Sequence, residues 1–151
     1  MKMQPVMLHS DSRTPSSWRA RPRSFVALMG LYESNHVRLT ALAGDLRHLA
    51  GEMRSIVAGD CELVLTVTER TPYTSGVNLT YWLAPPTASV LESVPDMLVR
   101  IYHDARVVEC TGFAAAASPV DRELDQRWAR NVMLNKWLEY CADRGHRFAT
   151  R

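Results

Sequence analysis

The sequence predicts an α+β fold in which a four-stranded antiparallel sheet carries an N-terminal and a C-terminal helix on one face. Three observations lead to this prediction. Apolar residues recur at helical spacing from residue 25 onward, short segments between residues 61 and 113 alternate apolar and polar residues, and a second helical pattern closes the chain. A run of strands between two helices is typical of a sheet whose helices are segregated to one face.

The composition is that of a folded chain outside the membrane. The 151 residues are 46% hydrophobic and 23% charged, which is enough apolar material for one core. No apolar run reaches the roughly 18 residues of a membrane helix, and the N-terminus lacks the compact apolar segment of a signal peptide. We therefore expect a cytoplasmic protein.

The cysteines indicate neither a metal site nor a disulfide framework. Cys61, Cys110 and Cys141 are odd in number, far apart and outside any CxxC motif, whereas zinc sites and secreted frameworks normally use paired cysteines. We expect free buried thiols, with no metal and no other cofactor.

Residues 1–23 are expected to form a disordered basic leader, and residues 24–151 a single α+β domain. The leader is rich in Ser, Pro and Arg and carries one aromatic residue, Trp18, so it offers too little apolar surface to offset its chain entropy. Such an arm can contact nucleic acid or an acidic partner, but an idle tail is the favoured interpretation.

The first helix is expected to begin after Ser24, whose hydroxyl suits an N-cap. Its apolar positions recur at helical spacing: Phe25, Leu28, Met29, Tyr32, Leu39, Leu42 and Leu46. On its other side, Glu33 and His36 form an E-x-x-H pair like those of di-iron bundles. Because such bundles need two of these motifs and further carboxylates, a solvated helix surface is favoured.

Four strands follow. "CELVLTVTE" (61–69) and "VNLTYWL" (77–83) alternate, and residues 70–76 connect them. The prolines in residues 84–96 remove ladder donors, so this segment is expected to be a surface loop. The last two strands, 97–103 and 106–113, complete the sheet.

The segment "RIYHDARVVEC" (100–110) is expected to be a hairpin. Its turn pairs Tyr102 with Val107 and Arg100 with Glu109, the second as a cross-strand ion pair. His103 and Asp104 are neighbours at a strand end, so their side chains should point to opposite faces. A turn is therefore favoured over a His–Asp catalytic couple.

The C-terminal helix is expected to start at Ser118 as N-cap with Pro119 in its first turn, and to end at Gly145. Its buried side is expected to consist of Leu124, Trp128, Leu134, Trp137, Leu138 and Cys141. Asn131 and Asn135 form a polar stripe, which we interpret as solvated rather than as a binding surface.

The sheet face away from the helices is the predicted binding surface, because it mixes aromatic and polar residues. It is expected to carry Val64, Thr66, Thr68, Asn78, Thr80, Trp82, Leu98, Arg100, Tyr102, Val107 and Glu109. The candidate ligand- or partner-binding residues are Glu69, Arg70, Tyr73, Thr74, Trp82, Arg100, Tyr102, His103 and Asp104. No catalytic residue is assigned, and pairing of this face in a homodimer is the simpler alternative.

Four segments resemble, in order and spacing, the YqiB-like family of small bacterial proteins of unknown function. They are "LYESNHVRLTAL", "VTERTPYTSGVNLTYW", "PDMLVRIYHDARVVEC" and "LNKWLEYCADRG". The resemblance covers about residues 24–148. It implies an αβα-type domain and gives no catalytic residue. Genes of this family often lie beside those of a cyclic AMP phosphodiesterase and an ADP-ribose pyrophosphatase, which implies a loose link to nucleotide signalling.

Three functions compete. A non-enzymatic binding or adaptor module is favoured, with an unknown protein or small ligand, such as a nucleotide, as its partner, because the motifs yield no nucleophile–base pair, metal cluster or phosphate loop. A small hydrolase or nucleotide-processing enzyme would require Glu69, Arg70, His103 and Asp104 to converge in one pocket. Nucleic-acid binding through the sheet face or the basic leader is the third function, and the net charge of −2 on residues 25–151 argues against the sheet face.

Overall fold

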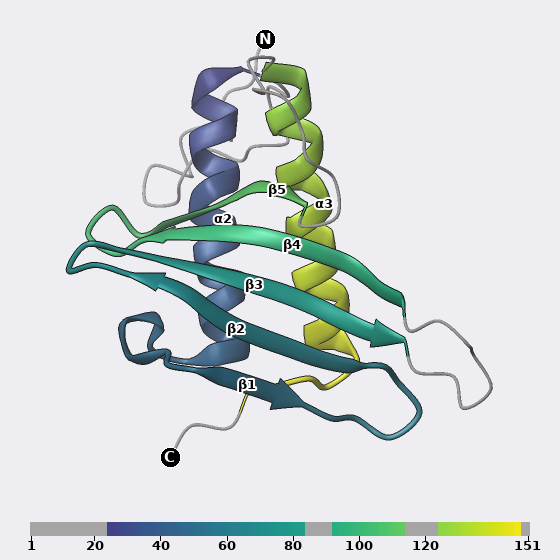
Figure 1. Ribbon diagram of the computed structural model, residues 1–151. Helices are drawn as coiled ribbons and strands as arrows, with labels where there is room; N and C mark the ends of the chain where they lie inside the picture. Colours follow the sequence, from purple (N-terminus) through teal and green to yellow (C-terminus); the bar gives the residue numbers. More distant parts are fainter. Residues whose placement is uncertain (1–23, 84–91, 114–123, 149–151) are drawn as a thin grey trace, which may run out of the picture.

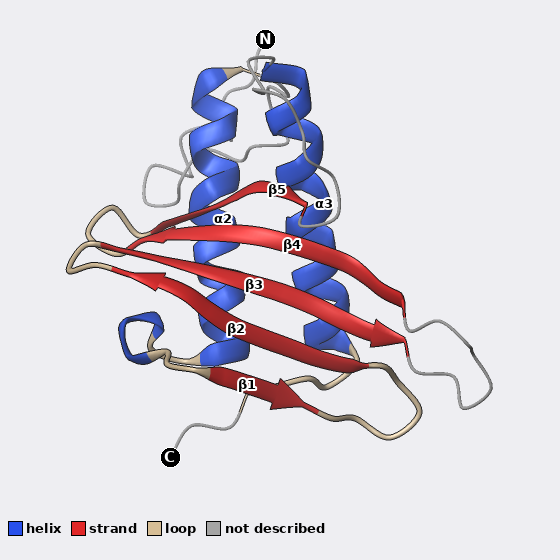
Figure 2. Ribbon diagram, in the orientation of Figure 1, coloured by secondary structure: helices blue, strands red, loops and turns tan. Residues whose placement is uncertain are grey.

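The computed structural model (Figures 1 and 2) describes residues 24–83, 92–113 and 124–148. The predicted leader and the predicted N-cap at Ser118 with Pro119 lie outside these ranges. Its elements are α2 (Phe25–Ala43), the short 3₁₀-helix η1 (Leu46–His48), β1 (Glu52–Ser55), β2 (Glu62–Arg70), β3 (Thr74–Leu83), β4 (Glu92–Tyr102), β5 (Val107–Phe113) and α3 (Leu124–Asp143).

The architecture is a two-layer α+β arrangement. Five antiparallel strands lie in the order β1-β2-β3-β4-β5, and both helices cover the same face of the sheet, running in the same direction (Figure 1). The predicted class and helix placement are confirmed, but the predicted number of four strands is wrong. No helix of the described residues is long and apolar enough to cross a membrane.

The missing strand is β1, which pairs Met53 with Leu65 of β2. Its four residues, "EMRS", are too few to show an alternating pattern. The strand forms because its backbone pairs with the edge of β2, whose N–H and C=O groups need hydrogen-bond partners. The sequence of β1 alone does not indicate this pairing.

The predicted loop at 84–96 is also wrong in part, because β4 already begins at Glu92. Thr80 pairs with Asp96 and Trp82 pairs with Ser93, so two residues of β4, one of them Pro95, lie opposite one residue of β3. Such a β-bulge leaves residues outside the regular ladder, which is where a strand tolerates proline.

A second bulge lies in β2. Val67 pairs with Val77 and Glu69 pairs with Gly76, which leaves Thr68 as the extra residue. A Cβ on Gly76 would approach the Thr68 hydroxyl to 3.2 Å, so the small residue fits the crowded bulge. Because one extra residue reverses the side-chain alternation, residues before and after Thr68 change faces.

The start of α2 and the end of α3 follow the predicted signals, whereas α2 ends at Ala43, before the predicted helical position Leu46. The Ser24 hydroxyl accepts a hydrogen bond from the Ala27 N–H at 3.0 Å. Gly145 adopts φ +94°, and the chain beyond α3 folds back so that the His146 N–H bonds the Cys141 carbonyl. The Phe148 N–H then bonds the Leu42 carbonyl at 2.9 Å, so the final described segment closes the end of α2.

The core lies between the sheet and the helices. Its buried members from α2 to the final segment are Leu39, Leu42, Ala43, Leu46, Leu49, Leu63, Leu65, Val77, Leu79, Tyr81, Met97, Val99, Ile101, Val108, Cys110, Leu134, Trp137, Leu138, Cys141 and Phe148. A second cluster places Trp128 of α3 against Leu28 and Leu31 of α2. The cysteines are free, as expected, with Cys61 half-buried and the other two buried.

The polar stripe of α3 is not solvated, which corrects the prediction. Asn131 and Asn135 are both fully buried, as is Asn35 of α2. The Asn131 Oδ1 accepts from the Cys110 N–H at 2.7 Å, and its Nδ2 donates to the Cys110 carbonyl at 3.3 Å. The side-chain amide therefore pairs with the β5 edge as the backbone of a sixth strand would.

Asn35 extends this network between the two helices and the sheet. Its Nδ2 donates to the Val108 carbonyl at 3.2 Å and to Asn131 Oδ1 at 3.3 Å. Its own Oδ1 accepts from Asn135 Nδ2 at 3.0 Å. The three asparagines thus fix the positions of α2, α3 and β5 relative to one another.

The β4–β5 hairpin has the predicted register: Tyr102 faces Val107 and Arg100 faces Glu109. The turn is a four-residue loop from His103 to Arg106. The predicted Arg100–Glu109 ion pair is wrong in its partner, because the Arg100 guanidinium pairs with Glu69 at 3.6 Å.

Replacing Asn131 with alanine should lower the free energy of unfolding by about 2 to 4 kcal/mol, since buried polar groups of Cys110 and Asn35 lose their partner. Urea denaturation measures this loss. Gln126→Ala, at an exposed position of the same helix, is the control and should change stability little. Equal effects of the two substitutions would contradict the edge-pairing role.

Candidate functional site

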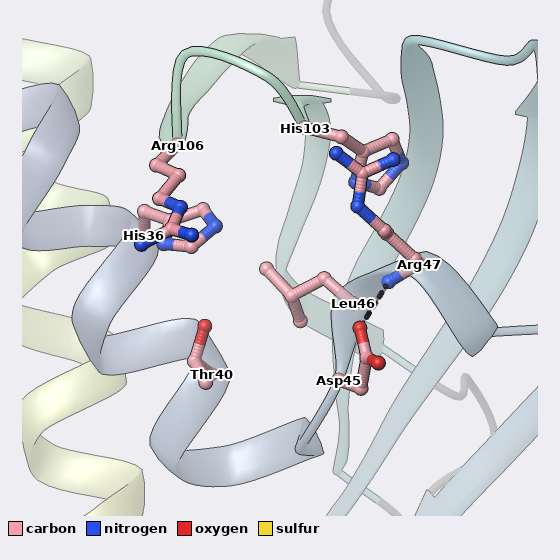
Figure 3. Close-up of a pocket in the computed structure, with 7 residues that line it drawn as sticks. All are labelled: His36, Thr40, Asp45, Leu46, Arg47, His103 and Arg106. Atoms are coloured by element: carbon pink, nitrogen blue, oxygen red, sulfur yellow. Dashed lines mark hydrogen bonds between the residues drawn. The ribbon is translucent and has the colours of Figure 1, made fainter.

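A basic pocket of about 300 Å³ lies between α2, η1 and the β4–β5 turn. Figure 3 shows its lining residues, which come from three segments far apart in the sequence. They are His36, Thr40, Asp45, Leu46, Arg47, His103 and Arg106.

Local structure brings each lining residue to the pocket. His36 and Thr40 are four residues apart on α2, so they lie on one face of the helix. Gly44 ends α2 at φ +77°, and the Asp45 carboxylate then caps η1 by accepting from the Arg47 N–H at 3.0 Å. This cap turns the Arg47 side chain toward the hairpin.

Arg106 occupies an unusual backbone position. It closes the hairpin turn at φ +57°, the left-handed region that costs most residues other than glycine about 1 to 2 kcal/mol. Its N–H bonds the Tyr102 carbonyl at 2.9 Å. Within the described part of the chain its guanidinium makes no ion pair.

The basic groups form two arginine–imidazole pairs. The charge of Arg106 acts on His36 and that of Arg47 acts on His103, and Figure 3 draws the first pair on one side of the pocket and the second on the other. The apolar Leu46 side chain lies between them. The Thr40 hydroxyl below is buried and has no hydrogen-bond partner among the described residues.

This crowding of positive charge disfavours protonation of both histidines. Burial, then the neighbouring Arg106 and His103, lowers the pKa of His36. Burial, then the charges of Arg47 and Arg70, lowers the pKa of His103, with weaker opposition from the nearby carboxylates. The neutral imidazoles are therefore favoured, and the arginines supply the positive charge of the pocket.

His103 and Asp104 do not interact as a catalytic couple, as the sequence indicated. His103 is buried, and its Nε2 lies 2.9 Å from the Ser75 hydroxyl. The Asp104 carboxylate instead accepts from Arg47 Nη2 at 3.1 Å. The doublet contributes its histidine to the pocket and its carboxylate to the rim.

The predicted residues Glu69 and Arg70 are consecutive in β2, so their side chains lie on opposite faces of the sheet. Glu69 pairs with Arg100 on the face away from the helices. Arg70 reaches to the helix side, where its guanidinium donates to the Leu49 carbonyl at 2.9 Å and to the Arg47 carbonyl at 2.7 Å. The convergence that a hydrolase built on these groups requires is therefore absent.

The remaining predicted residues are also dispersed. Tyr73 is exposed in the β2–β3 turn, where the Thr74 hydroxyl lies 2.7 Å from the Thr71 hydroxyl. Trp82 is half-buried opposite Glu62. The half-buried Tyr102 donates its hydroxyl to Glu109 at 3.2 Å. Of the nine predicted site residues, only His103 lines the pocket.

The open sheet face is more polar than predicted. Val64 and Thr80 are buried there, and of its apolar and aromatic residues Trp82, Leu98, Tyr102 and Val107 only Leu98 is exposed. The Asp96 carboxylate accepts from Asn78 Nδ2 at 2.7 Å and from the Thr80 hydroxyl at 2.9 Å. The described carboxylates of this face, Glu52, Glu62, Glu69, Asp96 and Glu109, outnumber its arginines, Arg54 and Arg100.

A separate buried cluster contains the residue types of a catalytic triad. The Ser55 hydroxyl lies 2.9 Å from His146 Nδ1, and His146 Nε2 lies 3.0 Å from Asp60 Oδ2. All three side chains are buried, so the serine cannot meet a substrate. The Ser55 hydroxyl also accepts from the Arg147 N–H at 2.9 Å, and the cluster holds the final segment against β1.

Asp60 is the anionic centre of this cluster. Burial alone would raise its pKa, but hydrogen bonds from the Tyr81 hydroxyl, at 2.6 Å, from the Cys61 N–H, from His146 and from Arg144 lower it to about 2. Among the described residues, no group of three or more histidines, cysteines and acids is placed to hold a metal ion.

Only one lining residue belongs to a motif that the sequence shows. His36 is part of the E-x-x-H pair, and its side chain is half-buried in the pocket wall rather than solvated. Arg47, Arg106 and Thr40 belong to no motif. Their proximity depends on how three separate segments meet.

Comparison with known proteins confirms the family resemblance. The DUF1249 family, described as a protein of unknown function, matches residues 38–147. Uncharacterized proteins YqiB from Escherichia coli strains K12, O6:H1 and O157:H7 are 31% identical to this chain over 137 residues, which cover 80% of this chain and 90% of theirs. No solved structure matches the chain.

Stability should fall as the pH drops from about 4 to about 2. The pKa of Asp60 is lower in the folded state than its usual value near 3.9, so its contribution is complete above pH 4 and is lost as the folded carboxylate becomes protonated. Urea denaturation of the wild type and of Asp60→Asn across this range tests the effect. The free energies of unfolding of the two proteins should converge toward pH 2. A difference that stays constant with pH would contradict the stabilising role of the Asp60 carboxylate.

Proposed function

This chain belongs to the DUF1249 family of proteins of unknown function, and we propose that it is a non-enzymatic binding protein that holds a small anionic ligand in the basic pocket. The observation that carries this proposal is the convergence of His36, Arg47, His103 and Arg106 from three elements around one space. An anion there would meet guanidinium donors on two sides and form charge-assisted hydrogen bonds.

Arg106 gives separate support. Its left-handed backbone conformation costs stability, which a functional role would explain. The carboxylates at the pocket and its rim are already engaged: Asp104 pairs with Arg47, and Asp45 caps η1 and contacts His48 Nδ1 at 3.0 Å. The exposed Arg106 guanidinium is therefore available to a bound anion.

Binding is favoured over catalysis by the same contacts. Asp45, the single carboxylate among the lining residues, is committed to the η1 cap. The Ser–His–Asp cluster is buried elsewhere, and Glu69 lies on the opposite sheet face. Nucleotides fall within the proposed ligand class, in line with the loose link to nucleotide signalling that the family resemblance implies.

The open sheet face is the weaker candidate for a partner surface. Its excess of carboxylates would repel nucleic acid, and its aromatic side chains are half-buried. Because Arg100 lies on this face, the same substitution at Arg100 and at Arg106 distinguishes the two locations.

Thermal unfolding of the purified protein should shift to higher temperature with phosphate, sulfate, citrate or adenosine monophosphate, because a ligand of the folded state stabilises it by mass action. Arg106→Gln should remove most of the shift. Arg100→Gln removes the same charge from the sheet face and should retain it. Loss of the shift in Arg100→Gln alone, or no shift with any anion, would refute the pocket as the binding site.

Without ligand, Arg106→Asn should leave stability unchanged or raise it by up to about 1 kcal/mol, because asparagine adopts the left-handed conformation more readily than arginine. Chemical denaturation gives the stability, and the anion-induced thermal shift of the same variant gives the binding. Binding should be lost while stability is kept. A clear loss of stability would indicate a structural role for the arginine.

A further inference from the structure

We infer that the ligand of the pocket is a phosphomonoester, bound as its dianion, and that binding is coupled to proton uptake by His36 and His103. This inference rests on the proposed anion-binding function and specifies the ligand chemistry and the pH response of the same site.

The geometry favours a tetrahedral anion over a planar one. A carboxylate presents two oxygens in one plane and is satisfied by one guanidinium fork. Here Arg106 with His36 and Arg47 with His103 lie on opposite sides of the Leu46 side chain (Figure 3). An anion whose oxygens point in several directions can meet the donors of both pairs, as a phosphoryl group does.

The size of the pocket is consistent with a phosphoryl group and a small part of its ester. A volume of about 300 Å³ is at the lower limit of small-molecule sites. The organic group of a larger phosphomonoester would therefore lie outside the pocket, and the phosphoryl end would supply most of the recognition.

Proton coupling follows from the charges around each histidine. His36 faces Arg106 and His103, whose positive charges oppose its protonation. His103 faces Arg47 and Arg70, with Asp104 and Asp45 acting in the opposite sense. A dianion between the pairs reverses the sign of the local field, so it raises the affinity of both rings for protons.

By linkage, the affinity must then rise as the pH falls toward the range in which free histidine is protonated. The phosphomonoester limits this rise, since its second pKa is about 6 and the dianion is lost below that value. The tightest binding is expected between about pH 6 and pH 7.

Three ligands that share a phenyl group separate shape from charge. Phenyl phosphate is a tetrahedral dianion at pH 7, phenyl sulfate is a tetrahedral monoanion, and benzoate is a planar monoanion. Isothermal titration calorimetry of the full chain at pH 7 should show phenyl phosphate binding at least about tenfold more tightly than the other two. Benzoate or phenyl sulfate binding as tightly would overturn the phosphomonoester assignment.

The same titrations in two buffers of different ionisation enthalpy measure the protons taken up. Phenyl phosphate should bind with net proton uptake, and His36→Gln should reduce that uptake. His48→Gln is the control, because His48 is an exposed histidine of η1 outside the pocket lining. His36 is half-buried, so its variant is expected to fold, and the urea unfolding curve verifies this.

Proton uptake that is zero, or unchanged in His36→Gln, would overturn the coupling. If binding still depends on Arg106 in that case, the proposed anion-binding function stands without the proton coupling. If none of the three phenyl ligands and none of the anions in the thermal screen binds, both the inference and the proposed function fail.

Discussion

The pairing of the Asn131 side chain with the backbone of Cys110 is the contact on which the arrangement of the two layers depends. An edge strand presents unpaired N–H and C=O groups, and burying them without partners is costly. Here a helix covers the edge and supplies the hydrogen bonds through one amide. Because Asn131 also accepts from Asn35, the same contact fixes the second helix.

The position of the pocket follows from this network. Asn35 bonds the Val108 carbonyl at the start of β5, and the next residue along α2 is His36. The helix is thus held where His36 faces the turn that precedes β5, and Arg106 closes that turn. The wall contributed by α2 and the wall contributed by the hairpin are therefore held in place by one set of buried amides.

Local signals predicted those parts of the fold that local chemistry decides. Ser24 as a cap, Gly145 as a terminator and the register of Tyr102 with Val107 each depend on a few neighbouring residues. The strand β1 was not predicted because it forms by pairing with the edge of β2. The bulge at Thr68 was not predicted because it depends on the register between β2 and β3. The burial of Asn131 was not predicted because periodicity analysis assigns asparagine to the solvent-facing side of a helix. Here the backbone of β5, rather than water, provides the hydrogen-bond partners of its side chain.

The candidate site was less predictable than the fold for a related reason. A binding surface was expected along the sheet, where aromatic and charged residues are close in sequence. The pocket instead gathers Thr40, Arg47 and Arg106 from segments that no motif connects. Only His36 belongs to a recognisable motif, the E-x-x-H pair. That motif suggests metal binding, whereas in the structure His36 lies in a pocket lined by arginines.

The bond from the Phe148 N–H to the Leu42 carbonyl has a consequence for biosynthesis. During translation α2 leaves the ribosome early, but the cap on its last turn comes from a residue about a hundred positions later. The segment that carries Arg47 follows that turn directly. A nascent chain from which both pocket arginines have emerged therefore still lacks the contact that closes the end of α2, until residue 148 follows.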